Sequence, residues 1–169
     1  MLVAIPDSTL VPAPREISYI QCVETKIKTF LGHRAMRSDI LRGLQMHQFA
    51  HFMCHGTLGQ ENPFNASLKL YGGNHLELLD IVWSQLPAVE FVFLSTCHTA
   101  ELAEGSFPGV GLHLTAAVQH CRFQSIVSIM WAMANKDGAL VAEYFYGSNF
   151  LSDGTTLPYY KISKGNLGC

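Results

Sequence analysis

Two side chains of this 169-residue chain could together carry out nucleophilic chemistry. Cys97 follows the small polar residues Ser95 and Thr96, and His55 directly precedes Gly56. A thiol becomes a strong nucleophile when a neighbouring imidazole takes its proton, so a cysteine and a histidine within hydrogen-bonding distance form an acyl-transfer dyad. The two residues are distant in the sequence, so the fold must bring them together.

Each of these residues follows an apolar run that is typical of a buried strand. The run Phe91 to Leu94 is large, apolar and without a polar break, and Gln48 to Met53 is similar. Such runs favour strands that are buried on both faces, as in the middle of a parallel sheet. Parallel neighbours would place His55 and Cys97 at the carboxyl edge of the sheet, where α/β proteins form their sites.

The remaining periodicity predicts helices that alternate with strands, which indicates βαβ units and a parallel sheet. We expect strands at Leu2–Ile5 and Ser125–Trp131, and a short strand or hairpin at Ser67–Tyr71 with Gly72-Gly73-Asn74 as its turn. Apolar spacing predicts the following helices: Arg15 to Leu31, ended by Gly32; Ser38 to Leu44, capped by Ser38; Leu76 to Trp83; Val110 to Cys121; and one capped by Asn135 or Asp137, with Leu140, Val141, Tyr144 and Phe145 facing inward.

Composition narrows the class of protein. Hydrophobic residues make up 49% of the chain and charged residues only 14%, well below the roughly 25% of an ordinary domain. This balance favours one compact α/β domain, or a fragment with an apolar face that a neighbour covers. The net charge of −2 gives no electrostatic footprint for nucleic acid or an anionic membrane.

The five cysteines are odd in number and lack a C-x-x-C pair, which favours reduced thiols in the cytoplasm over a secreted disulfide framework. The apolar start, Met1 to Ile5, ends at Pro6 without a preceding basic region, so we expect no secretory signal. No run approaches the roughly eighteen apolar residues of a membrane span.

Three segments in order resemble the CHAT domain, a family grouped with caspases and separases among the cysteine peptidases. They are a strand ending in Cys54-His55-Gly56, a second continuing as Leu94-Ser-Thr-Cys-His-Thr-Ala100, and the Ser125–Trp131 strand. The resemblance implies a caspase-like three-layer α/β/α sandwich with a mostly parallel central sheet. It runs from about Leu2 to Phe150, so we expect a domain over residues 1–150 and an irregular tail, or a truncated last element, over 151–169.

The resemblance also implies roles for individual residues. His55 would be the catalytic histidine and Cys97 the nucleophile of a dyad, and the backbone N–H groups of Gly56 and Cys97 would bind the oxyanion. It implies protein or peptide substrates in a regulatory, cell-death or immune pathway, with upstream repeat or sensor domains as partners and no cofactor. Four residues are candidates for a substrate pocket: Ser95, Thr96, His98 and Trp131.

Other interpretations of the same residues remain open. Cys97 could be a buried structural thiol and His55 a hydrogen-bonded loop histidine. Cys54 alternates with His55 along the strand, so we expect it in the core. A zinc site is disfavoured because it lacks ligand pairs with the usual spacing; its ligands would be Cys54, His55, Cys97 and His98.

Two alternative functions follow from these readings. The chain could be a catalytically silent interaction or regulatory module that depends on fused or partner domains, and the low charge and irregular tail favour this. A redox thiol protein is a weaker alternative, because no resolving cysteine lies near Cys97 in the sequence. The remaining histidines are expected to be surface or supporting groups, among them His47, His51, His75, His98, His113 and His120.

Overall fold

A five-stranded parallel sheet forms the centre of the fold. The computed structural model describes residues 1–6, 13–23, 26–57, 66–84, 86, 89–95, 123–128 and 135–149. The strand order is β2-β1-β3-β7-β8, and every neighbouring pair is parallel. The bounds are β1 (Leu2–Ile5), β2 (Lys28–Leu31), β3 (Phe49–Phe52), β7 (Phe91–Leu94) and β8 (Ser125–Ser128).

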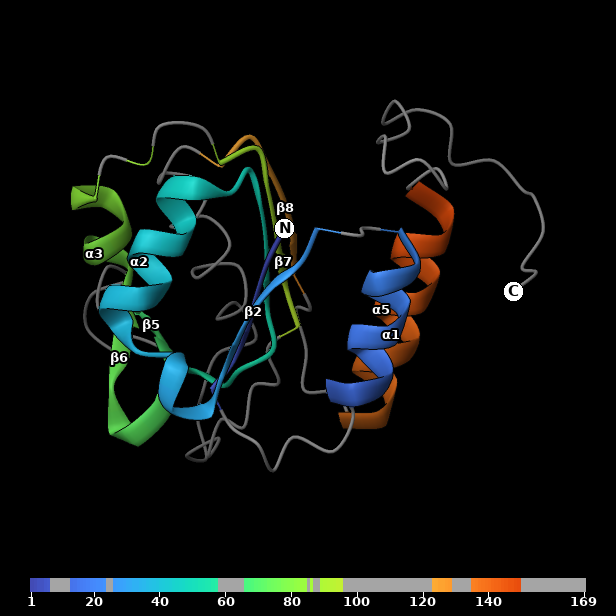
Figure 1. The fold of residues 1–169 in the computed structure, drawn as a ribbon, viewed down its shortest axis with the longest axis horizontal. Helices are drawn as coiled ribbons and strands as arrows, with labels where there is room; N and C mark the ends of the chain where they lie inside the picture. Colours follow the sequence, from blue (N-terminus) through green and yellow to red (C-terminus); the bar gives the residue numbers. More distant parts are fainter. Residues whose placement is uncertain are drawn as a thin grey trace, which may run out of the picture.

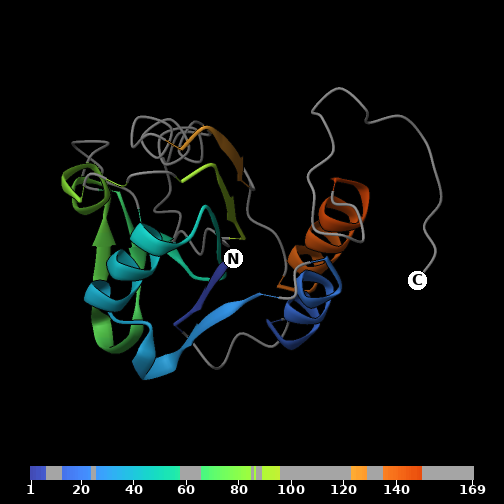
Figure 2. The same ribbon diagram turned by 45° about the horizontal axis from the view of Figure 1, so that its top comes forward.

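Helices cover both faces of this sheet, as Figures 1 and 2 show. On one face α1 (Ala13–Val23) lies beside α5 (Asn135–Asn149), and on the other lie α2 (Arg37–Met46) and α3 (Leu78–Trp83). The predicted three-layer α/β/α arrangement with a mostly parallel sheet is therefore confirmed. Within the described ranges, no helix has both the length and the apolar character needed to cross a bilayer.

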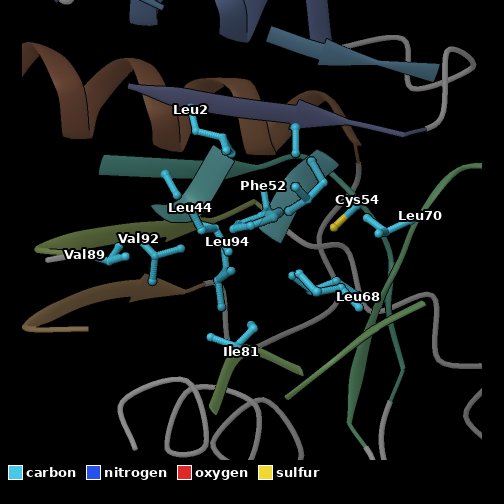
Figure 3. Close-up of a cluster of buried hydrophobic side chains, with 14 of the residues drawn as sticks. Leu2, Leu44, Phe52, Cys54, Leu68, Leu70, Ile81, Val89, Val92 and Leu94 are labelled. Carbon is cyan, nitrogen blue, oxygen red and sulfur yellow. The ribbon is translucent and has the colours of Figure 1, made fainter. Parts of the chain in front are cut away.

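The central strands are buried on both faces, which explains their unbroken apolar sequences. In β1, Leu2 belongs to the apolar cluster under α2 and α3, whereas Val3 belongs to the cluster under α1 and α5. In the same way Leu94 and Phe93 of β7 belong to opposite clusters. Each such fully buried side chain stabilises the fold by about 1.5–3 kcal/mol relative to exposure, and Figure 3 shows the first cluster.

A second, antiparallel sheet follows the central strand β3. Its order is β4-β5-β6, and its strands are β4 (Gly56–Thr57), β5 (Ser67–Lys69) and β6 (His75–Glu77). A short 3₁₀ turn, Tyr71–Gly73, joins β5 to β6, and both of its glycines have positive φ, 67° at Gly72 and 77° at Gly73. Glycine adopts this conformation without steric cost, so the predicted hairpin and its Gly-Gly turn are confirmed.

The prediction of one helix from Arg15 to Leu31 was wrong. Helix α1 ends at Val23, and Lys28–Leu31 forms the edge strand β2, followed by a 3₁₀ turn at Gly32–Arg34. Ile27, Phe30 and Leu31 have helical spacing, but β2 pairs with β1 along its whole length. Pairing with a strand distant in sequence overrides the local periodicity here.

The starts of two other helices also differ from the prediction. Helix α2 is preceded by Met36, with no side-chain cap, so Ser38 is inside the helix and does not cap it. Helix α3 begins at Leu78 and not at Leu76, because His75–Glu77 pairs with β5. Glu77 and Asp80 then form a capping box at its start, which satisfies two N–H groups that the helix leaves unpaired.

The inward face of α5 was predicted in part: Val141 and Phe145 pack against the core as expected. Leu140 and Tyr144 are 49% and 60% exposed, whereas Ala142 and Tyr146 are completely buried. The buried stripe therefore runs through Ala142 and Tyr146 and not through Leu140 and Tyr144. The helix expected over 110–121, residues 129–131 of the Ser125–Trp131 strand and the tail expected over 151–169 lie outside the described residues.

Candidate active site

Strands β3 and β7 end together at one edge of the central sheet. Phe49 to Phe52 pair in parallel with Phe91 to Leu94, and the Ser95 N–H donates to the Phe52 carbonyl oxygen at 2.9 Å. The prediction that these two strands are parallel neighbours is confirmed. His55 comes three residues after Phe52, and Cys97 comes three residues after Leu94. Four predicted site residues lie outside the described part of the chain: Thr96, Cys97, His98 and Trp131.

His55 lies where the chain passes from the central sheet to the small sheet. The residue is half-buried and lines a pocket of about 340 Å³, together with Pro6, Cys54 and the β5–β6 segment 69–75. Its carbonyl oxygen accepts a hydrogen bond from the Lys69 N–H at 2.8 Å. The backbone of His55 is therefore held by β5 at the wall of a solvent-accessible pocket.

The backbone of Gly56 has an orientation that follows from the strand pairing. The bond from Lys69 to the His55 carbonyl marks those two residues as a hydrogen-bonded antiparallel pair. The next pair, Gly56 and Leu68, is then a non-hydrogen-bonded pair, whose N–H groups point away from the partner strand. Among the described strands β4 lies at the edge of the small sheet, so the Gly56 N–H points away from β5.

Cys54 belongs to the core, as its alternation with His55 predicts. The residue is 3% exposed and packs in the cluster that includes Phe52 and Leu68 (Figure 3). Burial disfavours the thiolate and raises the pKa of Cys54 to about 12. This thiol holds even less thiolate at neutral pH than an ordinary cysteine, so it is a poor nucleophile.

Helix α5 approaches the end of β7 very closely. A β-carbon added at Gly138, in the first turn of α5, would lie 3.2 Å from the Ser95 Oγ. Ser95 is half-buried at this contact, two residues before Cys97 in the sequence. The sequence analysis placed Ser95 near the pocket but did not identify Gly138, and the only signal for it was a glycine inside a helical stretch.

A buried polar network lies on the α1–α5 side of the sheet. His51 of β3 has its Nδ1 at 2.7 Å from the Tyr146 hydroxyl of α5 and its Nε2 at 2.8 Å from Glu16 Oε1 of α1. The exposed fractions of these residues are 0% for His51 and Tyr146 and 3% for Glu16. The sequence analysis took His51 for a surface or supporting group. A polar residue in a doubly buried strand must find buried partners, and this was the available signal.

A known protein family matches this chain over most of its length. In the described part of the chain, no three histidine, cysteine or acidic residues form a group that could hold a metal ion. None of the curated proteins matches this chain in sequence. The sequence profile of the CHAT domain matches residues 5–152, which is most of the chain and includes both β3 and β7. The chain therefore belongs to the CHAT domain family, which is related to the caspase-like cysteine peptidases.

Proposed function

We propose that this chain is a caspase-like cysteine endopeptidase whose dyad is His55 and Cys97. The observation that carries the proposal is the register of the two central strands. Phe52 and Leu94 are direct neighbours, and His55 and Cys97 each follow their strand by the same three residues. Two residues that follow neighbouring parallel strands by the same number of positions start from the same edge of the sheet. A short turn after each strand therefore suffices to bring the two side chains together.

The proposed reaction uses each group in turn. The His55 imidazole takes the proton from the Cys97 thiol, and the thiolate attacks the carbonyl carbon of the scissile peptide bond. The tetrahedral intermediate then collapses, and His55 returns the proton to the leaving amine. A water molecule, activated by the same imidazole, hydrolyses the resulting thioester and frees the enzyme.

The developing oxyanion needs donors that are already in place. We assign this role to the backbone N–H groups of Gly56 and Cys97. The outward direction of the Gly56 N–H supports the first assignment, because that group is turned away from β5. The glycine also lets a substrate carbonyl approach the backbone without meeting a β-carbon.

The pocket beside His55 supports a site that is open to a peptide. Its volume of about 340 Å³ accommodates one or two substrate side chains, and residues 69–75 form much of its lining. We propose protein or peptide substrates, a cytoplasmic location, and upstream repeat or sensor domains as partners. Ser95, Thr96, His98 and Trp131 remain proposed pocket residues.

A peptide library tests the dyad directly. The wild-type chain should cleave a subset of peptides, and Cys97→Ala should abolish the cleavage because the nucleophile is gone. His55→Gln should lower kcat/KM by about 10²–10⁴-fold, the usual contribution of a general base. His47→Gln serves as the matched control, since His47 follows α2 and bonds the Gly43 carbonyl oxygen; its rate should stay within about twofold of wild type.

Two results would reject the proposal. Cleavage that survives in Cys97→Ala would place the nucleophile elsewhere. A folded wild-type chain that cleaves no peptide, and whose Cys97 reacts with iodoacetamide no faster than Cys54, would favour the alternative function. That alternative is a catalytically silent interaction module that acts through fused or partner domains.

A further inference from the structure

Three side chains of the His51 network hold together the elements that carry the proposed site. Glu16 comes from α1, His51 from β3 and Tyr146 from α5, and all three are buried. The His51 ring is also stacked on Phe93 of β7, with ring centroids 4.7 Å apart and an angle of 8° between the planes. One imidazole thus contacts three separate elements in addition to its own strand.

One assignment of the His51 tautomer satisfies both hydrogen bonds of this network. Burial, with a further contribution from the charge of Glu16, raises the pKa of Tyr146 well above its ordinary value, so the phenol keeps its proton. Tyr146 can then donate its O–H to Nδ1 of His51, while the Nε2–H of His51 donates to the Glu16 carboxylate. Every polar atom named here has a partner.

Such a network contributes little to stability compared with apolar side chains of the same size. Hydrogen bonds are directional, however, and apolar contacts such as those of Phe93 with Phe145 and Tyr146 tolerate small sliding movements. The bond between Tyr146 and His51 therefore adds a directional constraint to the apolar packing of α5 on the sheet.

Two members of this network are close in sequence to residues of the proposed site. His51 lies in β3, and His55 follows it by four residues, just after the strand ends. Tyr146 is eight residues after Gly138, which abuts the Ser95 side chain at the end of β7. Eight helical residues span about 12 Å, and a helix is rigid over this length. A shift of Tyr146 along the helix axis therefore moves Gly138 by the same amount.

We propose that Glu16, His51 and Tyr146 are positioning residues that set α5 against the end of β7 and so fix Ser95, two residues before the proposed nucleophile in the sequence, relative to β3. The part of this inference that concerns catalysis rests on the proposed function. The placement of α5 itself can be measured without any substrate.

Tyr146→Phe removes the hydroxyl and keeps the ring, and Tyr144→Phe is its matched control. Tyr144 is on the same helix but 60% exposed, so its hydroxyl is outside the network. Hydrogen exchange should be followed at the Ser95 amide, which bonds to Phe52, and at the Glu90 amide, which bonds to Gln48 at the other end of the same strand pair.

In Tyr146→Phe we expect the Ser95 amide to exchange about tenfold faster, as for the loss of one buried hydrogen bond. The Glu90 amide and both amides of Tyr144→Phe should keep their wild-type rates. Equal acceleration at Ser95 and Glu90 would indicate general destabilisation and would overturn the proposal, as would unchanged exchange at Ser95.

A second pair of variants tests the other end of the network. Glu16→Gln keeps an oxygen acceptor for the His51 Nε2–H and should retain wild-type exchange at Ser95, whereas Glu16→Leu should resemble Tyr146→Phe. If Glu16→Gln and Glu16→Leu behave alike, the hydrogen bond is not what positions α5.

Peptide cleavage provides the link to catalysis. In Tyr146→Phe, kcat should fall by about tenfold while KM stays unchanged, because the reacting groups and not the pocket are displaced. An unchanged kcat together with faster Ser95 exchange would overturn the catalytic part and leave the structural part standing. If the wild type cleaves nothing, the proposed function fails, and the exchange rates still decide whether the network positions α5.

Discussion

At the scale of single residues, two polar groups of strand β3 and the turn after it show how burial decides chemistry. His51 and Cys54 are both nearly without exposure, but His51 has two hydrogen-bonding partners whereas Cys54 lies among apolar side chains. The first can stay polar in the core, and the second is held as a neutral thiol. His55, in contrast, is half-buried and lines a pocket, so its titratable ring is accessible to a substrate.

The buried thiol of Cys54 should make stability depend on pH above neutrality. Its folded pKa of about 12 exceeds the ordinary value of 9.0, so between these values the folded state binds more protons than the unfolded state. The contribution is complete below pH 9 and is lost as the pH rises towards 12. At pH 10 the loss is on the order of 1 kcal/mol.

Urea unfolding of the wild type and of Cys54→Ala at pH 8 and pH 10 measures this effect. Other groups titrate equally in both proteins, so the variant should lose about 1 kcal/mol less stability between the two pH values. The pKa of Tyr146 is also raised. Its effect on the pH dependence of stability is the same in both proteins, so it cancels in the comparison. Identical losses in the two proteins would contradict the burial of a neutral thiol.

At the scale of elements, an ion pair joins the two helices on one face of the sheet. Arg37 at the start of α2 is paired with Asp80 in α3, and the Asp80 side chain is only 2% exposed. The same carboxylate accepts the Glu77 N–H at 2.9 Å in the capping box. Asp80 thus connects the start of α3 to α2 and stabilises the helix end itself.

Arg37→Ala should destabilise the protein by about 1–3 kcal/mol, because it leaves a buried carboxylate without its charged partner. Arg42→Ala is a matched control on the same helix. Arg42 pairs with Asp39 at 3.9 Å, and both side chains are exposed, so its loss should cost about 0.5 kcal/mol or less. Thermal or urea unfolding measures both, and equal effects of the two variants would show that the Asp80 pair is worth no more than a surface pair.

At the scale of the whole molecule, a glycine in α2 allows this helix to lie close to the central sheet. Helix α2 lies against β1 and β2 at Gly43, where an added β-carbon would be 2.4 Å from Leu2 Cδ1 and 3.1 Å from the Phe30 ring. Leu2 is completely buried, so it cannot move aside without disturbing the core. The layer of α2 and α3 therefore depends on this glycine for its close approach to the sheet.

The same substitution at two helical glycines should have opposite effects. Gly43→Ala gains about 1 kcal/mol of helix propensity but loses about 1–3 kcal/mol through overpacking, so we expect net destabilisation. Gly147→Ala in α5 meets no atom within 4 Å and should stabilise the protein by up to about 1 kcal/mol. Urea midpoints that shift in the same direction for both variants would contradict the packing described for Gly43.

Much of the framework could be predicted from the sequence. The apolar runs at 48–53 and 91–94 indicated the two central strands, and the alternation of strands with helices indicated a parallel sheet with helices on both faces. The Gly72-Gly73 turn and the inward direction of Cys54 were also predicted correctly. These features follow from local rules, because the period of apolar residues and the φ angles open to glycine belong to the segment itself.

Only the tertiary structure decided the features that depend on contacts between distant segments. Lys28–Leu31 has helical spacing and is a strand because β1 lies beside it; His51 is an interior residue because Glu16 and Tyr146 reach it from two other elements. The sequence by itself determined which residues end the central strands and which chemistry they offer. The fold decided which buried groups support that edge, because a hydrogen bond between elements depends on positions that no local pattern encodes.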